Sequence, residues 1–186
     1  MPEATLIQRP KVSAPAISVI GMAGSGKTTI GRMLARLLGW AFMDTDQLIE
    51  SVYATRLQNI TDALSRDEFL DLEQSVITSV RASRCVISTG GSSVYREGSM
   101  RYLQGLGPVV CLDAPFPVIR DRIALHPDRG LVIAEGQTLE GLYNERKVLY
   151  DRYGTMHCDA TRPPEECAEW IRAHLPPGVL GKVADS

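Results

Sequence analysis

The sequence predicts an α/β protein in which helices cover both faces of a parallel β-sheet. Short apolar segments alternate along the 186 residues with stretches whose apolar side chains recur at helical spacing. A glycine-rich segment joins the first apolar segment to the first helical one. Polar residues follow directly after several apolar segments, at the strand ends where parallel sheets bind ligands. These three observations together favour a ligand-binding parallel sheet over an all-helical or antiparallel protein.

The expected strands are short and apolar, with helices between them. Strands are expected over residues 16–20, 40–43, 85–88, 108–113 and 156–160. Helices are expected over residues 28–38, 47–53, 67–80 and around 144–150. The helix at 28–38 should end at Gly39, because glycine favours the left-handed conformation that stops helices. The helix at 67–80 carries one apolar stripe, which predicts one buried face.

One domain is expected to span residues 15–175. Residues 1–14 are expected to form a loose leader, and residues 176–186 a flexible tail with little pattern. Residues of about 124–138 are expected to form a lid, since this glycine-containing connection is long for a compact domain. An ordinary mobile loop is the alternative for that segment.

The composition indicates a small-molecule partner rather than a nucleic acid or a membrane. Hydrophobic residues make up 44% of the chain, charged residues 23%, and the formal net charge is −2. No basic run, bilayer-length apolar segment or signal-peptide pattern is present. The four cysteines and three histidines lack metal or redox spacing, so we expect reduced thiols and a cytoplasmic protein.

The stretch "GMAGSGKTT" at residues 21–29 fits the phosphate-binding pattern G-x-x-x-x-G-K-[ST]. Its glycines let several backbone N–H groups face one point at the start of a helix, which suits the phosphates of ATP. Lys27 should reach the β- and γ-phosphates, and the Thr28 hydroxyl should bind Mg²⁺. The predicted nucleotide-binding residues here are Gly21, Ala23, Gly24, Ser25, Gly26, Lys27, Thr28 and Thr29. The loop alone is equally compatible with a kinase, a switch protein or an ATPase.

Two further polar segments follow predicted strands and should meet this loop. Asp44 and Asp46 follow the second strand, and in an extended segment both carboxylates would face the same side. Asp44 is expected to support Mg²⁺, and Asp46 to hold or deprotonate an attacking hydroxyl. The alternative for Asp46 is capping of the next helix. Gly90 and Gly91 follow the third strand and could bring backbone N–H groups close to an anionic substrate, or form a plain turn.

Three arginines lie in or near the predicted lid. Arg129 could close over the phosphates and neutralise charge during transfer, which makes it a catalytic candidate with Lys27 and Asp46. Arg122 could lie along the nucleotide, and Arg146 could point back into the cleft. A solvated surface position is the alternative for each arginine taken alone.

Together these segments resemble the shikimate kinase family of small P-loop kinases. The matching pieces lie between about Ile17 and Ile171 and read "GMAGSGKTTIGRMLARLLG", "FMDTDQLIE", "FLDLE", "VISTGG", "VVCLD" and "ERKVLYDRYG". The resemblance implies a P-loop three-layer α/β/α fold with five parallel strands in the order 2-3-1-4-5, a lid, and a small substrate-binding subdomain at about 46–82. It implies a monomeric enzyme of amino-acid biosynthesis that transfers the γ-phosphate of ATP to a small hydroxy acid, most readily shikimate. It places Arg146 on the substrate carboxylate and Glu73 beside it.

Several substrate-side residues depart from the family pattern. Leu70 stands where a second carboxylate-binding arginine is usual, Ser65 and Arg66 replace a Gly-Glu pair, Ser92 replaces a third glycine, and the lid reads "RGLV" at 129–132. Loss of a charge-assisted hydrogen bond of ~1.5–3 kcal/mol would weaken shikimate binding roughly 10- to 100-fold if nothing compensates. Arg66 is a possible compensator. Another hydroxy acid such as homoserine, or a non-catalytic nucleotide-binding module, is the alternative. Nucleoside monophosphate kinases and gluconate-type kinases fit these residues less well.

Overall fold

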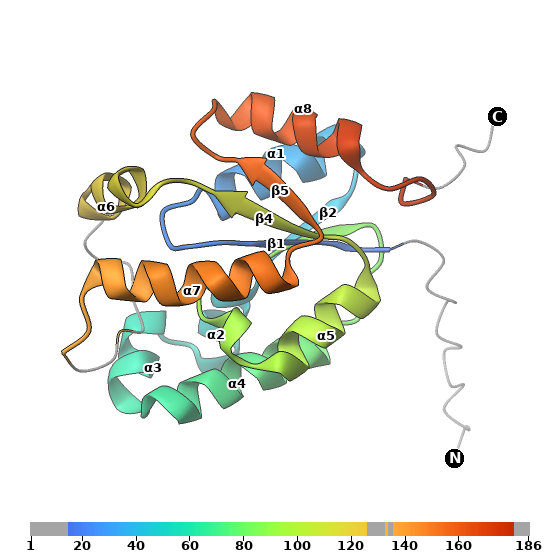
Figure 1. Cartoon of the computed structure of the whole chain (residues 1–186). Helices are drawn as coiled ribbons and strands as arrows, with labels where there is room; N and C mark the ends of the chain where they lie inside the picture. The colour runs from blue at the N-terminus through green and yellow to red at the C-terminus, as the bar shows by residue number, and fades with distance from the viewer. Residues whose placement is uncertain (1–14, 126–132, 134–135, 181–186) are drawn as a thin grey trace, which may run out of the picture.

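The computed structural model describes residues 15–125, 133 and 136–180, and it contains one five-stranded parallel sheet (Figure 1). The strands are β1 Ile17–Ile20, β2 Ala41–Asp44, β3 Cys85–Ser88, β4 Val109–Asp113 and β5 Met156–Asp159. Their order across the sheet is β2-β3-β1-β4-β5, and every neighbouring pair is parallel. The predicted fold class and strand order are therefore confirmed. Strand β2 extends to Asp44 because this residue still pairs with Ser88.

Helices lie on both faces of the sheet, with α1 and α8 packed together on one face and α5 and α7 on the other (Figure 1). The helices are α1 Lys27–Leu38, α2 Thr45–Tyr53, α3 Leu57–Ala63, α4 Arg66–Ser79, α5 Glu97–Leu106, α6 Phe116–Ala124, α7 Leu139–Tyr153 and α8 Pro164–His174, with a short 3₁₀ turn at Ser93–Tyr95. The predicted helices at 28–38 and 67–80 agree with α1 and α4 to within one residue at each end. The short helix α3 has too few residues to show a helical period in the sequence, and we did not predict it.

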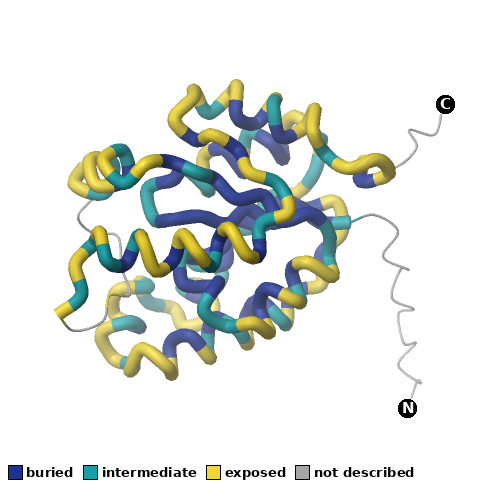
Figure 2. The backbone as a smooth tube through the Cα atoms, in the orientation of Figure 1, coloured by how far each residue is buried: buried dark blue, intermediate teal, exposed yellow. Residues whose placement is uncertain are grey.

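The core is divided into a large cluster around the sheet and a small one under α2, α3 and α4. Strands β1 and β3 are buried along their whole length, whereas the edge strand β2 is partly exposed (Figure 2). The small cluster consists of Ile49, Ile60, Phe69 and Val76. Helices α2 to α4 therefore pack on one another as a unit beside the sheet. The predicted substrate-binding subdomain at about 46–82 includes these three helices, and its role stays a prediction.

The predicted lid and chain ends are only partly described. Helix α6 ends at Ala124 and α7 begins at Leu139, and most of the predicted lid, including Arg129, lies outside the described residues. The predicted leader at 1–14 also lies outside them, as do residues 181–186 of the predicted tail. Residues 177–180 form a turn in which Val179 is buried. None of the described helices is long and apolar enough to cross a membrane.

Candidate active site

The carboxyl ends of β1, β2 and β3 meet at one cavity of about 800 Å³. Because the strands are parallel and adjacent, the segments that follow them emerge at the same edge of the sheet. The cavity is also lined by α3, α4 and α7. Of the residues predicted from the sequence, it brings together Ala23, Lys27, Thr28, Thr29, Asp44, Asp46, Gly90, Gly91 and Arg146. The glycine-rich loop and the acidic and arginine residues thus form one continuous surface.

The glycine-rich loop has a backbone that other residues rarely adopt. Gly24 and Gly26 have φ angles of 80° and 96°, in the left-handed region that L side chains disfavour. Gly26 directly precedes α1, so the loop ends at the positive end of that helix. The Lys27 ammonium folds back over the loop and donates to the carbonyls of Gly21 at 2.8 Å and Met22 at 2.9 Å. The loop therefore holds a cation where a polyphosphate can replace these carbonyl contacts.

Thr28 and Asp44 are paired across the loop, with the Thr28 hydroxyl donating to Asp44 Oδ2 at 2.9 Å. The other oxygen, Asp44 Oδ1, accepts from the backbone N–H groups of Asp46 at 3.1 Å and Gln47 at 3.4 Å. Asp44 is therefore the residue that caps α2, and the suggestion that Asp46 does so is wrong. A hydroxyl beside a carboxylate is a donor set that suits Mg²⁺.

Asp46 lies in the first turn of α2 and not in an extended segment, because the helix begins at Thr45. The premise that Asp44 and Asp46 alternate along an extended chain is therefore wrong, although both carboxylates line the cavity. Burial, and secondarily the nearby Asp44 carboxylate, raises the pKa of Asp46 to about 6. At neutral pH the group is still ionised and can accept a proton.

Glu73 and Asp46 both press against Gly90. A Cβ atom on Gly90 would lie 2.2 Å from Glu73 Oε1 and 2.6 Å from Asp46 Oδ1, so only glycine fits here without displacement. Glu73 is 1% exposed, and its Oε1 atom has no hydrogen-bond partner within the described part of the chain. Burial and then Asp46 raise the pKa of Glu73 to about 8. Both carboxyl groups therefore hold a proton more tightly than a carboxyl group in water does, and burial is the main cause for each.

Arg146 reaches the cavity from α7 and is 2% exposed. Its Nε donates to the Tyr95 hydroxyl at 3.3 Å, and its guanidinium carbon lies 5.2 Å from the centre of the Tyr95 ring. A Cβ atom on Gly91 would lie 3.0 Å from Arg146 Nη1, so the guanidinium lies directly against the glycine turn. The Tyr150 hydroxyl holds that turn by donating to the Gly91 carbonyl at 2.7 Å. This arrangement presents a fixed cation that suits a carboxylate.

The outer side of the phosphate-binding loop borders a second cavity of about 240 Å³. Arg122 lines it and donates to the carbonyls of Gly24 at 3.4 Å and Ala160 at 2.9 Å. Arg162 lines the same cavity, and we did not predict it, although its place just after β5 was an available signal. A guanidinium can stack on the face of a base as well as pair with a phosphate, so this second cavity suits a nucleotide.

Sequence reasoning missed a group of polar residues on α3 and the turn before it. Arg56, Gln58 and Asn59 line the large cavity together with the predicted residues. Because α3 spans only Leu57–Ala63, no periodic pattern marked these side chains as facing a site.

A separate cluster of possible metal ligands lies on β4 and β5. One ligand atom each from Cys111, Asp113 and His157 lies within 4.8 Å of the others, which the sequence spacing did not reveal. These groups contact one another instead, with His157 Nδ1 2.8 Å from Asp113 Oδ2 and the Cys111 thiol donating to Asp113 Oδ1 at 3.4 Å. Burial raises the pKa of the Cys111 thiol, which keeps it protonated.

Comparison with known proteins places this arrangement among small-molecule kinases. The family model described as "Shikimate kinase" matches residues 23–176. A shikimate kinase of Synechococcus elongatus is 35% identical over 175 residues, which cover 90% of each chain. One of Gloeobacter violaceus is 37% identical over 158 residues, covering 83% of this chain and 89% of the relative. The structure of a shikimate kinase from Acinetobacter baumannii in complex with shikimate superposes with a TM-score of 0.78 at 29% identity, covering 87% of this chain and 92% of the other.

Proposed function

The chain belongs to the shikimate kinase family, and from this premise we propose that it transfers the γ-phosphate of ATP to a hydroxyl of shikimate. The observation that supports this most strongly is the single cavity lined by the phosphate-binding loop, by Asp46, and by the glycine turn with Arg146. The loop suits the donor phosphates, and a buried arginine beside backbone glycines suits the carboxylate of the acceptor. The protein would act as a cytoplasmic monomer.

Different residues act on the acceptor and on the phosphates of ATP. Asp46 accepts the proton of the acceptor hydroxyl while the hydroxyl oxygen attacks the γ-phosphorus. The bond between the γ-phosphorus and the β–γ bridging oxygen then breaks, and ADP is released. Lys27 exchanges its loop carbonyls for the β- and γ-phosphates and neutralises the charge on the leaving ADP. Arg122 and Arg162 border the nucleotide's outer end.

Mg²⁺ would be held by the Thr28 hydroxyl, with Asp44 supporting it directly or through water. The 2.9 Å contact between these groups supports the assignment, because both present oxygen atoms at the end of the loop. When bound, the ion would screen the negative charge of the phosphates. Because Asp44 also caps α2 through its other oxygen, the ion site is tied to the start of the helix that carries Asp46.

A second acceptor class is favoured by one observation, the buried Glu73 whose Oε1 lacks a hydrogen-bond partner among the described residues. With Leu70 in place of a second arginine, an acceptor that carries an ammonium group, such as homoserine, could pair with Glu73 or Asp46. The reaction would be unchanged, and only the acceptor would differ.

The test is ADP release by the purified protein with Mg²⁺-ATP and matched concentrations of shikimate, homoserine or gluconate. We expect turnover with shikimate and little with the other two. Turnover of homoserine with shikimate inert would retain the kinase and replace the acceptor. Absence of turnover with all three, together with normal ATP binding, would favour a non-catalytic nucleotide-binding module.

A further inference from the structure

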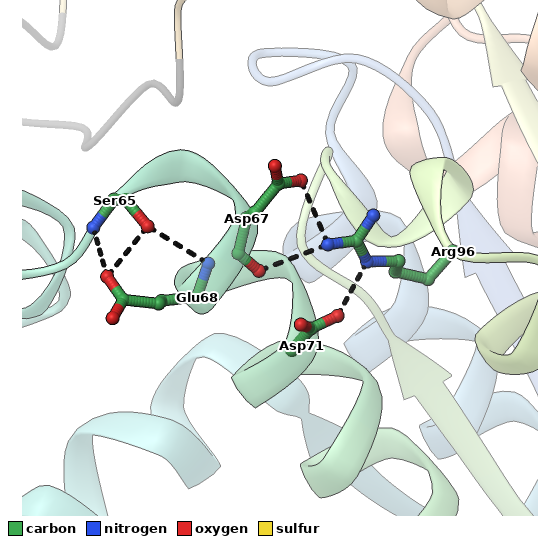
Figure 3. Close-up of polar contacts among 5 residues, drawn as sticks. All are labelled: Ser65, Asp67, Glu68, Asp71 and Arg96. Carbon is green, nitrogen blue, oxygen red and sulfur yellow. Dashed lines mark hydrogen bonds and ion pairs between the residues drawn. The ribbon is translucent and has the colours of Figure 1, made fainter.

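The first two turns of α4 are occupied by structural contacts (Figure 3). The Ser65 hydroxyl accepts from the Glu68 N–H at 3.3 Å, and the Ser65 N–H donates to Glu68 Oε2 at 2.9 Å, which closes a capping box. Arg96, at the start of α5, binds Asp67 at 3.0 Å and Asp71 at 2.8 Å. This end of α4 is therefore fixed by its own cap and by α5.

The remaining substitutions on α4 do not offer the cavity a cation. Leu70 is 3% exposed and apolar, so it cannot bind a carboxylate. Arg66 Nη2 lies 3.3 Å from Glu145 Oε1, and the Arg66 guanidinium carbon lies 4.5 Å from the centre of the Tyr95 ring. Arg66 is absent from the described lining of the cavity, and its charge is already paired. It supports the Tyr95 ring that Arg146 contacts from α7.

Arg56 does line the cavity, in the turn between α2 and α3. Its side chain is exposed, and within the described residues it forms no hydrogen bond or ion pair. The backbone around it is held firmly by Glu50. The Leu57 N–H donates to Glu50 Oε1 at 2.8 Å, and the Thr55 N–H to the Glu50 carbonyl at 3.3 Å. A fixed backbone thus carries an available guanidinium at the wall of the cavity.

We propose that Arg56 supplies the second cation that binds the carboxylate of the acceptor, in the role that Leu70 cannot fill on α4. This inference rests on the proposed function, since it assumes an acceptor with a carboxylate. Three cations line the cavity in the described part of the chain, namely Lys27, Arg56 and Arg146. Lys27 lies on the phosphate-binding loop, which leaves the two arginines for the acceptor. A carboxylate has two oxygens, and each guanidinium can donate to one of them.

The experiment compares wild type with Arg56→Gln, Arg56→Lys and Arg66→Gln, and with Arg36→Gln as a control on an exposed arginine at the far end of α1. Steady-state kinetics are measured with ATP and shikimate, and with a shikimate analogue whose carboxylate is reduced to a hydroxymethyl group. We expect Arg56→Gln to raise the KM for shikimate about 10- to 100-fold, with kcat and the KM for ATP nearly unchanged. The KM of Arg56→Lys for shikimate should lie between those of wild type and Arg56→Gln. The KM for the analogue should be the same in Arg56→Gln and wild type.

Three results would overturn the assignment while leaving the proposed function intact, provided that wild type turns over shikimate. The first is an unchanged KM for shikimate in Arg56→Gln. The second is an equal rise in the KM for the analogue in Arg56→Gln. The third is a rise in the KM for shikimate that occurs only in Arg66→Gln. The second result would mean that Arg56 acts elsewhere than on the carboxylate, and the third would make Arg66 the second cation. A wild-type protein that neither binds nor turns over shikimate would overturn both the proposed function and this inference. Unchanged thermal unfolding of each variant shows that the comparison concerns folded protein.

Discussion

The nucleotide side and the acceptor side of the cavity are built in different ways. The phosphate-binding loop is one continuous stretch, residues 21–29, and its shape follows from local glycine conformations and the start of α1. The acceptor side collects Arg56, Asp46, Gly90 and Arg146 from four segments spread over much of the chain. The continuous side fits its family pattern closely, whereas the assembled side departs from it at Leu70 and Ser92. A site assembled from distant segments can exchange one contributing element for another and keep its chemistry.

The two sides also differ in charge. On the nucleotide side, the Lys27 ammonium donates to the carbonyl oxygens of Gly21 and Met22. On the acceptor side, Asp46 and Glu73 are crowded against Gly90 and both have raised pKa values. The acceptor side is therefore where changes in pH should be felt. Five predictions test this contrast, beginning with the largest effect.

Replacing Lys27 with alanine should reduce kcat by about 10³–10⁵-fold, because the cation that neutralises the transferred phosphate is lost. Lys147→Ala is the matched control, since this exposed lysine pairs with Asp151 on α7. Both variants should unfold at the wild-type temperature. Undiminished kinase activity in Lys27→Ala would remove the basis for assigning residues 21–29 to ATP.

Asp46→Asn should lower kcat by roughly 10²–10⁴-fold while ATP affinity changes little, because an amide cannot take the hydroxyl proton. Single-turnover rates and separate nucleotide titrations measure the two quantities. A parallel loss of ATP affinity would instead give Asp46 a role on the nucleotide side, and the contrast between the two sides would fail for this residue.

The pH dependence of kcat/KM should report Asp46. Its raised pKa of about 6 means that the reactive, ionised form is lost below that pH, so kcat/KM should fall about tenfold per pH unit there and level off above it. The profile is measured for wild type and for the residual activity of Asp46→Asn. A fall that persists unchanged in the variant would point to another titrating group.

Glu73 should make the folded protein less stable as pH rises. Its pKa in the folded state is raised from 4.5 to about 8, so folding favours the protonated form. The stabilisation is complete below about pH 4.5 and is lost as the pH rises through 8. Between pH 5 and 8, the melting temperature should therefore fall less in Glu73→Gln than in wild type. Glu169→Gln, an exposed change on α8, should keep the wild-type slope.

Ser65→Ala should have the smallest effect, because it removes a helix cap outside the catalytic chemistry. Loss of the two hydrogen bonds that the Ser65 hydroxyl makes with Glu68 should cost about 1 kcal/mol, or ~2–4 °C in melting temperature. kcat should stay at the wild-type value. A large loss of activity with little loss of stability would mean that this end of α4 contacts the acceptor, contrary to its structural contacts with Glu68 and α5.

Much of the fold was predictable because it depends on local patterns. Alternating apolar strands and periodic helices indicated the parallel sheet, and the glycine spacing in residues 21–29 indicated the phosphate-binding loop. The prediction that Asp44 and Asp46 lie at the carboxyl end of the second strand was also correct, although Asp44 is the last residue of β2 and Asp46 is already helical. Helix α2 starts directly after Asp44, and whether a chain stays extended or turns into a helix at a strand end depends on capping contacts that spacing does not reveal.

The residues that surround the acceptor depend on packing between segments distant in sequence. Arg66 is paired by Glu145 of α7, Arg96 of α5 binds the acidic residues of α4, and Glu73 meets Asp46 only because both lie against Gly90. Local propensity carries no information on such pairings, because their free energy comes from burial and charge contacts formed after the helices pack. Sequence patterns alone were thus enough to predict the sheet and the nucleotide-binding loop. The position of Arg56 at the cavity wall depends on tertiary packing, which such patterns do not contain.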